Sequence, residues 1–233
     1  MLMTLELSVV PPSSASGIYG GSKDQLPERM RFLHPEAALS LAVMAPTRKV
    51  RCSDMLRTAE SSLQAHAEKR GVQPPGYSAH NFGLAIDIDV DYMLTQHDLN
   101  KTDLDRWMDE NGWVCHRTDH ANGSESWHYN FIGLPDTPDG DMYRGLIGKS
   151  SAPAVERKIQ NLYGACFSMN DVEVQASLQK LHFYSGECDG KIGPLSRQAI
   201  RAFQRAWRLD DTGMLDIKVE RTLAFVSADR HIT

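Results

Sequence analysis

The sequence predicts an α+β fold, in which a small antiparallel sheet flanked by helices is followed by an all-α domain of three helices. Residues 84–90 alternate apolar and polar side chains, which is the period of a strand with one buried face. Residues 35–44 and 99–110 carry helical patterns instead. Beyond residue 153 the sequence contains three further helical patterns. Strands and helices thus share the first part of the chain, while the second part is helical.

The length of 233 residues allows two domains, because a domain usually has about 100–150 residues. We predict an irregular N-terminal arm at residues 1–22, a first domain at 23–133, a linker at 134–152 and a second domain at 153–233. The arm is rich in Pro, Ser and Gly and has no period of either kind. The linker is placed where Pro, Gly, Asp and Ser are dense.

The elements follow in order. Proline in the first turn predicts the helix at residues 35–44. A second helix is predicted from Thr58, a fair N-cap residue, to residue 70, since Gly71 would end it. A loop rich in proline and glycine then leads into the alternating strand. The remaining predicted elements are strands at 49–52, 84–90, 113–116 and 126–132, and helices at 99–110, 155–163, 172–181 and 194–207.

Charge and hydropathy exclude several classes of function. The formal net charge is -5 and no continuous basic stripe is present, so we expect no nucleic-acid partner. No stretch approaches the ~20 apolar residues of a membrane span. The first ten residues lack the basic start and long apolar middle of a signal peptide. We therefore expect a protein that is made in the cytoplasm without a signal peptide. We also expect it to be a monomer.

The cysteines encode neither a redox motif nor a zinc ribbon. They stand far apart, without a CxxC pair, at Cys52, Cys115, Cys166 and Cys188. We interpret them as reduced structural thiols, with a Cys166–Cys188 disulfide as an alternative because both lie in the second domain. A structural zinc site of Cys115, His116 and His120 is a weaker alternative, because a fourth ligand at a recognised spacing is missing.

Four side chains form a candidate catalytic metal site: His80, Asp87, Glu125 and His128. Seven positions separate the first two, which is about 10 Å on a helix and about 23 Å on a strand. The chain must therefore turn between them if they share an ion, and Gly83 stands where such a turn is needed. Imidazole and carboxylate both suit zinc, and a catalytic site needs three protein ligands with one position open.

His128 is the natural third ligand, and Glu125 lies three residues before it. In a tight turn this spacing puts both side chains on one side, about 5–6 Å apart. The Glu125 carboxylate would then reach a water at the ion without binding the ion, as a general base requires.

The acidic face of the strand continues beyond the candidate ligand Asp87. Successive positions on one face of a strand are about 6.6 Å apart, so one ion cannot bind Asp87, Asp89 and Asp91 together. We interpret Asp89 as a residue that supports the ligands and Asp91 as solvated. A calcium loop is rejected, because its sixth position is Tyr92 instead of glycine.

Two segments resemble motifs of one family. Ser78-Ala-His-Asn-Phe-Gly-Leu-Ala-Ile-Asp87 resembles the motif SxHxxGxAxD of the zinc D-Ala-D-Ala carboxypeptidase and L-Ala-D-Glu endopeptidase family (peptidase M15-like), which includes phage endolysins. Glu125-Ser-Trp-His128 is similar to the ExWH motif of that family. The resemblance covers residues 49–131. It implies that His80, Asp87 and His128 bind Zn²⁺ and that Glu125 is the general base.

The same resemblance implies an arginine that stabilises the oxyanion of the tetrahedral intermediate. Arg57 is the best match, and Arg51 is its competitor. Ser78, Asp89 and Trp127 are interpreted as further residues of the site, beside the ligands or the substrate.

The second domain resembles the three-helix peptidoglycan-binding domain, whose hallmarks are a DGxxG turn and an AxxxFQ helix. The matching residues are Asp189–Gly193 and Ala199–Gln204. Leu178, Leu181, Ile200 and Phe203 are interpreted as core, and no ligand-contacting residue is assigned. Such patterns identify a fold better than a binding surface.

The two resemblances together imply a zinc-dependent peptidase of bacterial peptidoglycan, with an endolysin-like L-alanyl-D-glutamate endopeptidase as the leading hypothesis. Alternatives are a D-Ala-D-Ala carboxypeptidase and a non-catalytic wall-binding or phage structural protein. The intact set of four candidate residues disfavours the last. Because no signal peptide is predicted, we expect a lysin stored in the cytoplasm that acts on the cell wall after release.

Overall fold

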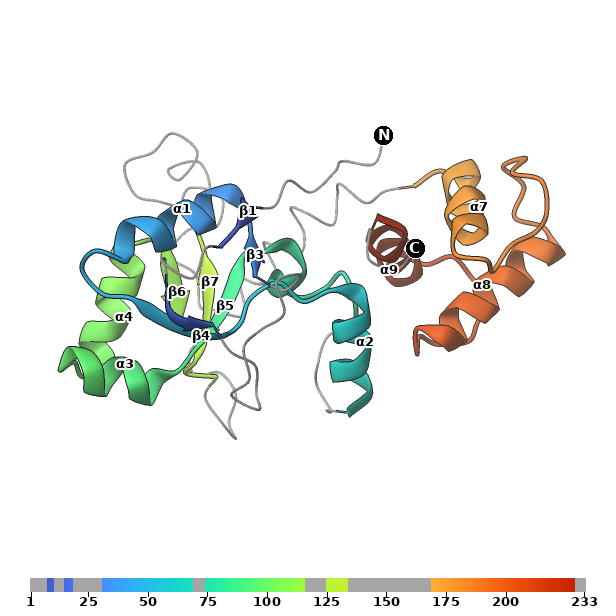
Figure 1. Cartoon of the computed structure of the whole chain (residues 1–233). Helices are drawn as coiled ribbons and strands as arrows, with labels where there is room; N and C mark the ends of the chain where they lie inside the picture. The colour runs from blue at the N-terminus through green and yellow to red at the C-terminus, as the bar shows by residue number, and fades with distance from the viewer. Residues whose placement is uncertain are drawn as a thin grey trace. The chain divides into compact units, whose positions relative to one another are not determined.

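The fold is described from a computed structural model. The described residues are 8–10, 15–18, 31–68, 74–115, 125–133 and 169–228 (Figure 1). The predicted linker at 134–152 and the predicted helix at 155–163 lie outside them. By its internal contacts the chain forms two compact units. We call them the sheet unit, within residues 5–57 and 79–159, and the helical unit, within 58–78 and 160–233.

The sheet unit contains a five-stranded sheet. In spatial order its strands are β2 (Ala15–Ile18), β4 (Val50–Asp54), β5 (Ala85–Ile88), β7 (His128–Phe131) and β6 (Trp113–Cys115). The last four strands pair antiparallel, whereas β2 is parallel to β4. Two further strands, β1 (Ser8–Val9) and β3 (Phe32–Leu33), form an antiparallel pair. The predicted α+β fold with a small sheet is confirmed.

The arm at residues 1–22 was predicted to be irregular, which is wrong for β1 and β2. Both strands are short, and β2 includes Gly17. Strands of this kind are held by the main-chain hydrogen bonds of a neighbouring strand, which need no alternating side-chain pattern. The sequence therefore shows no signal for them.

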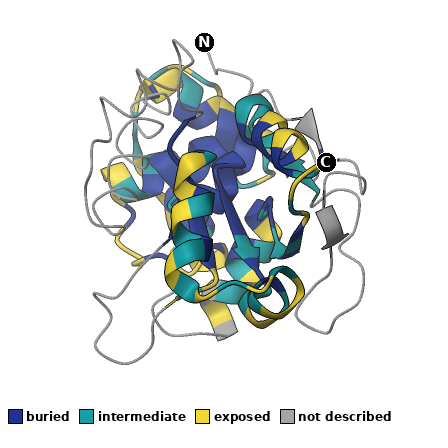
Figure 2. Cartoon of the chain, turned by 90° about the vertical axis from the view of Figure 1, so that its left-hand side faces the viewer, coloured by how far each residue is buried: buried dark blue, intermediate teal, exposed yellow. Residues whose placement is uncertain are grey.

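The helices of the sheet unit are α1 (Pro35–Met44), the 3-10 helix η3 (Ala79–Phe82), α3 (Val90–His97) and α4 (Lys101–Glu110). Helix α3 was not predicted, because the strand was extended to residue 90. In the structure Asp89 ends that extension: its carboxylate accepts a hydrogen bond from the Tyr92 backbone N–H at 3.0 Å, which caps α3. Buried residues gather in the strands and exposed ones on the outward helix faces (Figure 2).

The helical unit contains α2 (Ala59–Glu68), α7 (Asp171–Lys180), α8 (Pro194–Ala206) and α9 (Ile217–Ala228). Helices α7 and α8 confirm two of the predicted helices. Helix α9 was missed, because nearly all its residues after Val219 are buried and a helix buried all round shows no amphipathic period. Within the described residues, no helix has the length and apolar character to cross a membrane.

One segment assigned to the first domain packs instead with the C-terminal helices. The Thr222 hydroxyl of α9 donates to the Pro75 carbonyl at 3.3 Å, and the Arg221 guanidinium lies 4.7 Å from the centre of the Tyr77 ring. Between them, Gly76 has φ +85°, and a Cβ there would lie 3.1 Å from Cβ of Phe225. The units therefore differ from the predicted domains at residues 58–78.

This contact predicts that Gly76→Ala destabilises the helical unit. Alanine would have to adopt a left-handed conformation, which costs about 1–2 kcal/mol, and would also press on Phe225. Urea unfolding would measure the loss. Gly193→Ala is the matched control, because Gly193 has an ordinary φ of -85° and a Cβ there would meet no atom within 4 Å. Equal stability losses in both variants would contradict the prediction.

Candidate metal centre

A tight turn brings His80 toward the sheet, as the sequence predicted. The turn is η3, closed by a hydrogen bond from the Leu84 N–H to the Ala79 carbonyl at 3.0 Å. Gly83 ends it with φ +66°, and a Cβ at this position would lie 2.7 Å from the backbone nitrogen of His34. Glycine is therefore required here on two counts, conformation and space.

Strand pairing brings Asp87 and His128 together. They stand directly opposite each other in the antiparallel pair of β5 and β7. Side chains of such a pair project from the same face of the sheet. A tight turn precedes β7, in which the His128 N–H donates to the Glu125 carbonyl at 3.0 Å.

The three ligand atoms lie close enough to share one ion. Nδ1 of His128 is 2.9 Å from Oδ1 of Asp87, and Nε2 of His80 is 3.2 Å from that oxygen and 3.1 Å from Nδ1 of His128. Ligand atoms around a tetrahedral zinc, each about 2.0–2.1 Å from it, are about 3.3 Å apart. The observed spacing therefore fits a zinc ion with only small movements of the side chains.

The outer nitrogens of both imidazoles have acceptors. Nδ1 of His80 lies 2.7 Å from the Met55 carbonyl, so its N–H donates there and the Nε2 lone pair faces inward. Nε2 of His128 lies 3.2 Å from Oδ1 of Asn130, which leaves Nδ1 facing inward. Metal-binding histidines are held by outer hydrogen bonds of this kind. The donor set and its orientation thus fit a metal.

The charge state of Asp87 suits a ligand. Burial alone would raise the pKa of its carboxyl, but His80 and then His128, when protonated, outweigh that effect by charge and hydrogen bonding, so the pKa falls well below the usual range. A cation bound in place of those protons would act in the same direction. Asp87 is therefore ionised at neutral pH and has an oxygen lone pair for a cation.

Arg57 is the arginine beside this group. Its Nη2 lies 2.6 Å from Oδ2 of Asp54, and its backbone N–H donates to the His80 carbonyl at 3.1 Å. Burial would lower the pKa of the guanidinium, but the charges of Asp54, and then of Asp87 and Glu125, raise it above its ordinary value. Arg57 is thus a fixed cation in the field of two carboxylates of the candidate site.

The competitor Arg51 has different neighbours. It lies on β4, where its Nη1 is 3.4 Å from Oδ2 of Asp89 and its guanidinium is 4.8 Å from the centre of the Tyr92 ring. Asp89, predicted to support the ligands, thus caps α3 and pairs with Arg51. Arg51 and Asp89 therefore contact each other at the start of α3, whereas the Arg57 backbone donates a hydrogen bond to His80. This difference favours Arg57 as the arginine of the site.

The other predicted site residues lie in the two motif segments. Glu125 and Trp127 are exposed at the turn before β7, with 45% of the Trp127 surface accessible. Ser78 is buried immediately before η3. Two residues were missed, Asp54 and Asn130. In the sequence, the only feature that marks Asp54 is its position three residues before Arg57, and the only feature that marks Asn130 is its position two residues after His128.

None of the described cysteines belongs to the group of candidate ligands. Among the described residues, Cys52, Cys115 and Cys188 are free thiols. The alternative of a Cys166–Cys188 disulfide involves a residue outside the described ranges. Burial raises the pKa of the Cys52 and Cys115 thiols, so both are protonated and unreactive. Cys166, His116 and His120 lie outside the described residues, so the structure does not test the alternative zinc site.

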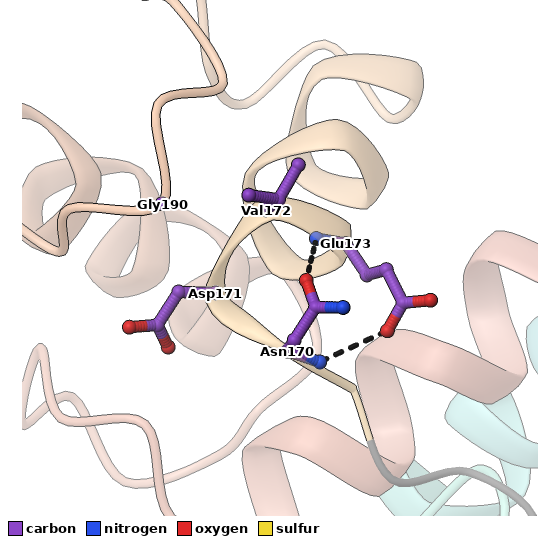
Figure 3. A pocket seen from close by; sticks show the side chains of 5 residues that line it. All are labelled: Asn170, Asp171, Val172, Glu173 and Gly190. Carbon is purple, nitrogen blue, oxygen red and sulfur yellow. Dashed lines mark hydrogen bonds between the residues drawn. The ribbon is translucent and has the colours of Figure 1, made fainter.

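A shallow pocket lies at the start of α7 in the helical unit (Figure 3). Its lining residues are Asn170, Asp171, Val172, Glu173 and Gly190. Asn170 and Glu173 form a capping box: Oδ1 of Asn170 accepts from the Glu173 N–H at 3.0 Å, and the Glu173 carboxylate accepts from the Asn170 N–H at 2.9 Å. Because these backbone donors are occupied, the start of α7 offers little to an anion.

Comparisons with known families divide the chain in the same way as its two sets of motifs. Residues 29–134 match the family model described as D-alanyl-D-alanine carboxypeptidase. Residues 170–223 match the model described as putative peptidoglycan binding domain. The chain therefore contains a domain of each family, and both resemblances seen in the sequence are confirmed. The first match includes all three candidate ligands and Glu125.

One curated relative shares part of the sequence. The chain is 30% identical over 98 residues to the N-acetylmuramoyl-L-alanine amidase CwlM of Mycobacterium tuberculosis. The match covers 38% of this chain and 24% of that protein. The chain thus corresponds to about a quarter of the length of this relative.

The geometry predicts one zinc ion per chain. His80→Ala and His128→Ala should each lose most of the bound zinc, because two remaining ligands hold the ion poorly. Metal analysis after dialysis against a weak chelator would measure the content. His182→Asn is the control, because His182 is exposed on the helical unit and asparagine tolerates its φ of 62°. Full zinc content in either alanine variant would disprove the ligand set.

Proposed function

We propose that this protein is a zinc-dependent peptidase that hydrolyses stem-peptide bonds of bacterial peptidoglycan. The observation that carries the proposal is the convergence of Nε2 of His80, Oδ1 of Asp87 and Nδ1 of His128 inside a domain of the carboxypeptidase family. These atoms lie within 4.8 Å of one another. The outer nitrogens of the two histidines already have hydrogen-bond acceptors.

The residues divide the work of hydrolysis. His80, Asp87 and His128 would hold the ion, which would supply Lewis acidity for polarising the scissile carbonyl and acidifying water. Glu125 takes the proton of the attacking water and passes it to the departing amine. The exposed position of Glu125 at the turn suits this task, because substrate and water can both approach its carboxylate.

Arg57 stabilises the negative charge that develops on the carbonyl oxygen. Its guanidinium stays charged at any relevant pH and is held by Asp54, so little reorganisation is needed when the charge appears. Asp54 therefore positions the arginine. The Asp54 carboxylate also offsets part of the positive charge of Arg57, which reduces the repulsion between the guanidinium and a metal ion nearby.

For the bond cleaved, we propose the L-alanyl-D-glutamate linkage, as in an endolysin-like enzyme. The peptidoglycan-binding domain supports this choice, because a module that retains the enzyme on an insoluble wall raises the local concentration of internal stem-peptide bonds. D-Ala-D-Ala carboxypeptidase activity is the second candidate, favoured by the description of the family that residues 29–134 match. An enzyme for free dipeptides would gain little from wall binding.

The proposed partner is peptidoglycan, bound by the helical unit of a monomer. We further propose that the protein is made in the cytoplasm and reaches the wall after release. The partial relative of M. tuberculosis is named as an N-acetylmuramoyl-L-alanine amidase, which supports a substrate of related chemistry.

The two candidate activities predict different products when purified sacculi are digested. Endopeptidase activity should release fragments with a new amino terminus on D-glutamate, read by mass spectrometry after amine labelling. Carboxypeptidase activity should release D-alanine instead. If zinc-loaded protein releases neither product while it still sediments with the sacculi, a non-catalytic wall-binding protein is the correct interpretation.

The proton-transfer task predicts the behaviour of Glu125→Gln. Its turnover should fall roughly 10²-fold or more, because an amide cannot accept the proton. Its zinc content and its sedimentation with sacculi should not change, because Glu125 holds neither the ion nor the wall. Rates on a soluble stem peptide, with metal analysis beside them, measure both. A Glu125→Gln protein of normal activity would exclude this base.

A further inference from the structure

Asn130 lies behind His128, on the side away from the other two ligands. It is two residues further along β7, so its side chain lies on the same face of the strand as the His128 imidazole. Its partner across the sheet is Ala85, as Asp87 is the partner of His128. The small methyl group of Ala85 leaves room for the longer amide opposite it.

The contact between the two side chains has a defined direction. Oδ1 of Asn130 lies 3.2 Å from Nε2 of His128, while Nδ1 of the same ring lies 2.9 Å from the Asp87 carboxylate. A neutral imidazole carries one proton, on one of its two nitrogens. Because Oδ1 of Asn130 can only accept a hydrogen bond, the proton of His128 is on Nε2. Nδ1 of His128 then has a free lone pair that points toward His80 and Asp87. A reversed amide would set two donors against each other.

Burial makes this contact costly for the fold. Asn130 has 0% of its surface accessible, and its Nδ2 has no hydrogen-bond partner among the described residues. A buried donor without a partner costs about 1–3 kcal/mol, and an apolar side chain of similar size would avoid that cost. Packing alone would therefore favour leucine at position 130.

We infer that Asn130 is a positioning residue for the metal centre: it accepts the Nε2–H of His128 and so determines which ring nitrogen faces the ion. This inference rests on the proposed zinc site. It assigns Asn130 a part equivalent to that of the Met55 carbonyl, which accepts from the outer nitrogen of His80 at 2.7 Å. The backbone serves one histidine and a buried side chain serves the other.

Asn130→Leu should separate metal binding from stability. Zinc affinity, measured by competition with a chromophoric chelator, should fall about 10–100-fold, the usual effect of removing the outer partner of a ligand histidine. The melting temperature of the metal-free protein should stay unchanged or rise. Asn130→Asp keeps an acceptor at the same place, so it should retain the affinity of the parent protein.

A buried amide of the helical unit provides the control. Gln175 is also fully buried, but its Nε2 has acceptors such as Asp189 at 3.1 Å and its Oε1 accepts from the Gly190 N–H at 2.7 Å. Gln175→Leu should therefore lower stability and leave zinc affinity unchanged, which is the opposite of Asn130→Leu.

The outcomes distinguish this inference from the proposed function. If the parent protein binds no zinc, the proposed function fails. If the parent binds zinc and Asn130→Leu binds it equally tightly, only the inference about Asn130 is overturned. Nitrogen-15 spectra of the histidine rings give a second measurement: in the zinc-loaded parent, His128 should carry its proton on Nε2, and a proton on Nδ1 would overturn the inference directly.

Discussion

The pairing of Asp87 with His128 across β5 and β7 is the constraint on which the candidate metal centre depends. The register holds one ligand opposite another, and main-chain hydrogen bonds extend the pairing on both sides, from the Phe131 N–H to Leu84 and from the Ile88 N–H to Trp127. A slip by one residue would turn His128 to the other face of the sheet. The third ligand needs only a short turn, which η3 and Gly83 provide.

Both histidines of the candidate centre and the nearby Arg57 are oriented by a neighbour. Carbonyl and amide oxygens accept from the outer nitrogens of the two histidines, and Asp54 holds the guanidinium of Arg57. Catalytic power in such a site comes from groups that are already in place when charge develops. Burial of apolar side chains in the sheet, among them Trp113 and Tyr129, stabilises the fold that holds these groups in place.

The helical unit is connected with the proposed activity in two ways. Its family match supports binding to the wall, and its helix α9 also packs on residues 75–77, a few residues before His80 in the chain. A simple tether would need only a linker. The contact of α9 with Pro75 and Tyr77 means that removing the C-terminal helices would also expose a segment that belongs to the matched carboxypeptidase domain.

The sequence by itself determined the fold class, the three candidate ligand positions and the partner motif Glu125-Ser-Trp-His128, because glycine, alternation and motif spacing are local properties. Only the tertiary structure decided what lies next to what. Arg51 and Arg57 are alike in sequence, and their neighbours Asp89 and Asp54 separate them. Helix α9 and the strands of the arm depend on contacts between distant segments. No local pattern encodes such contacts, since burial and strand partners are set by the whole fold.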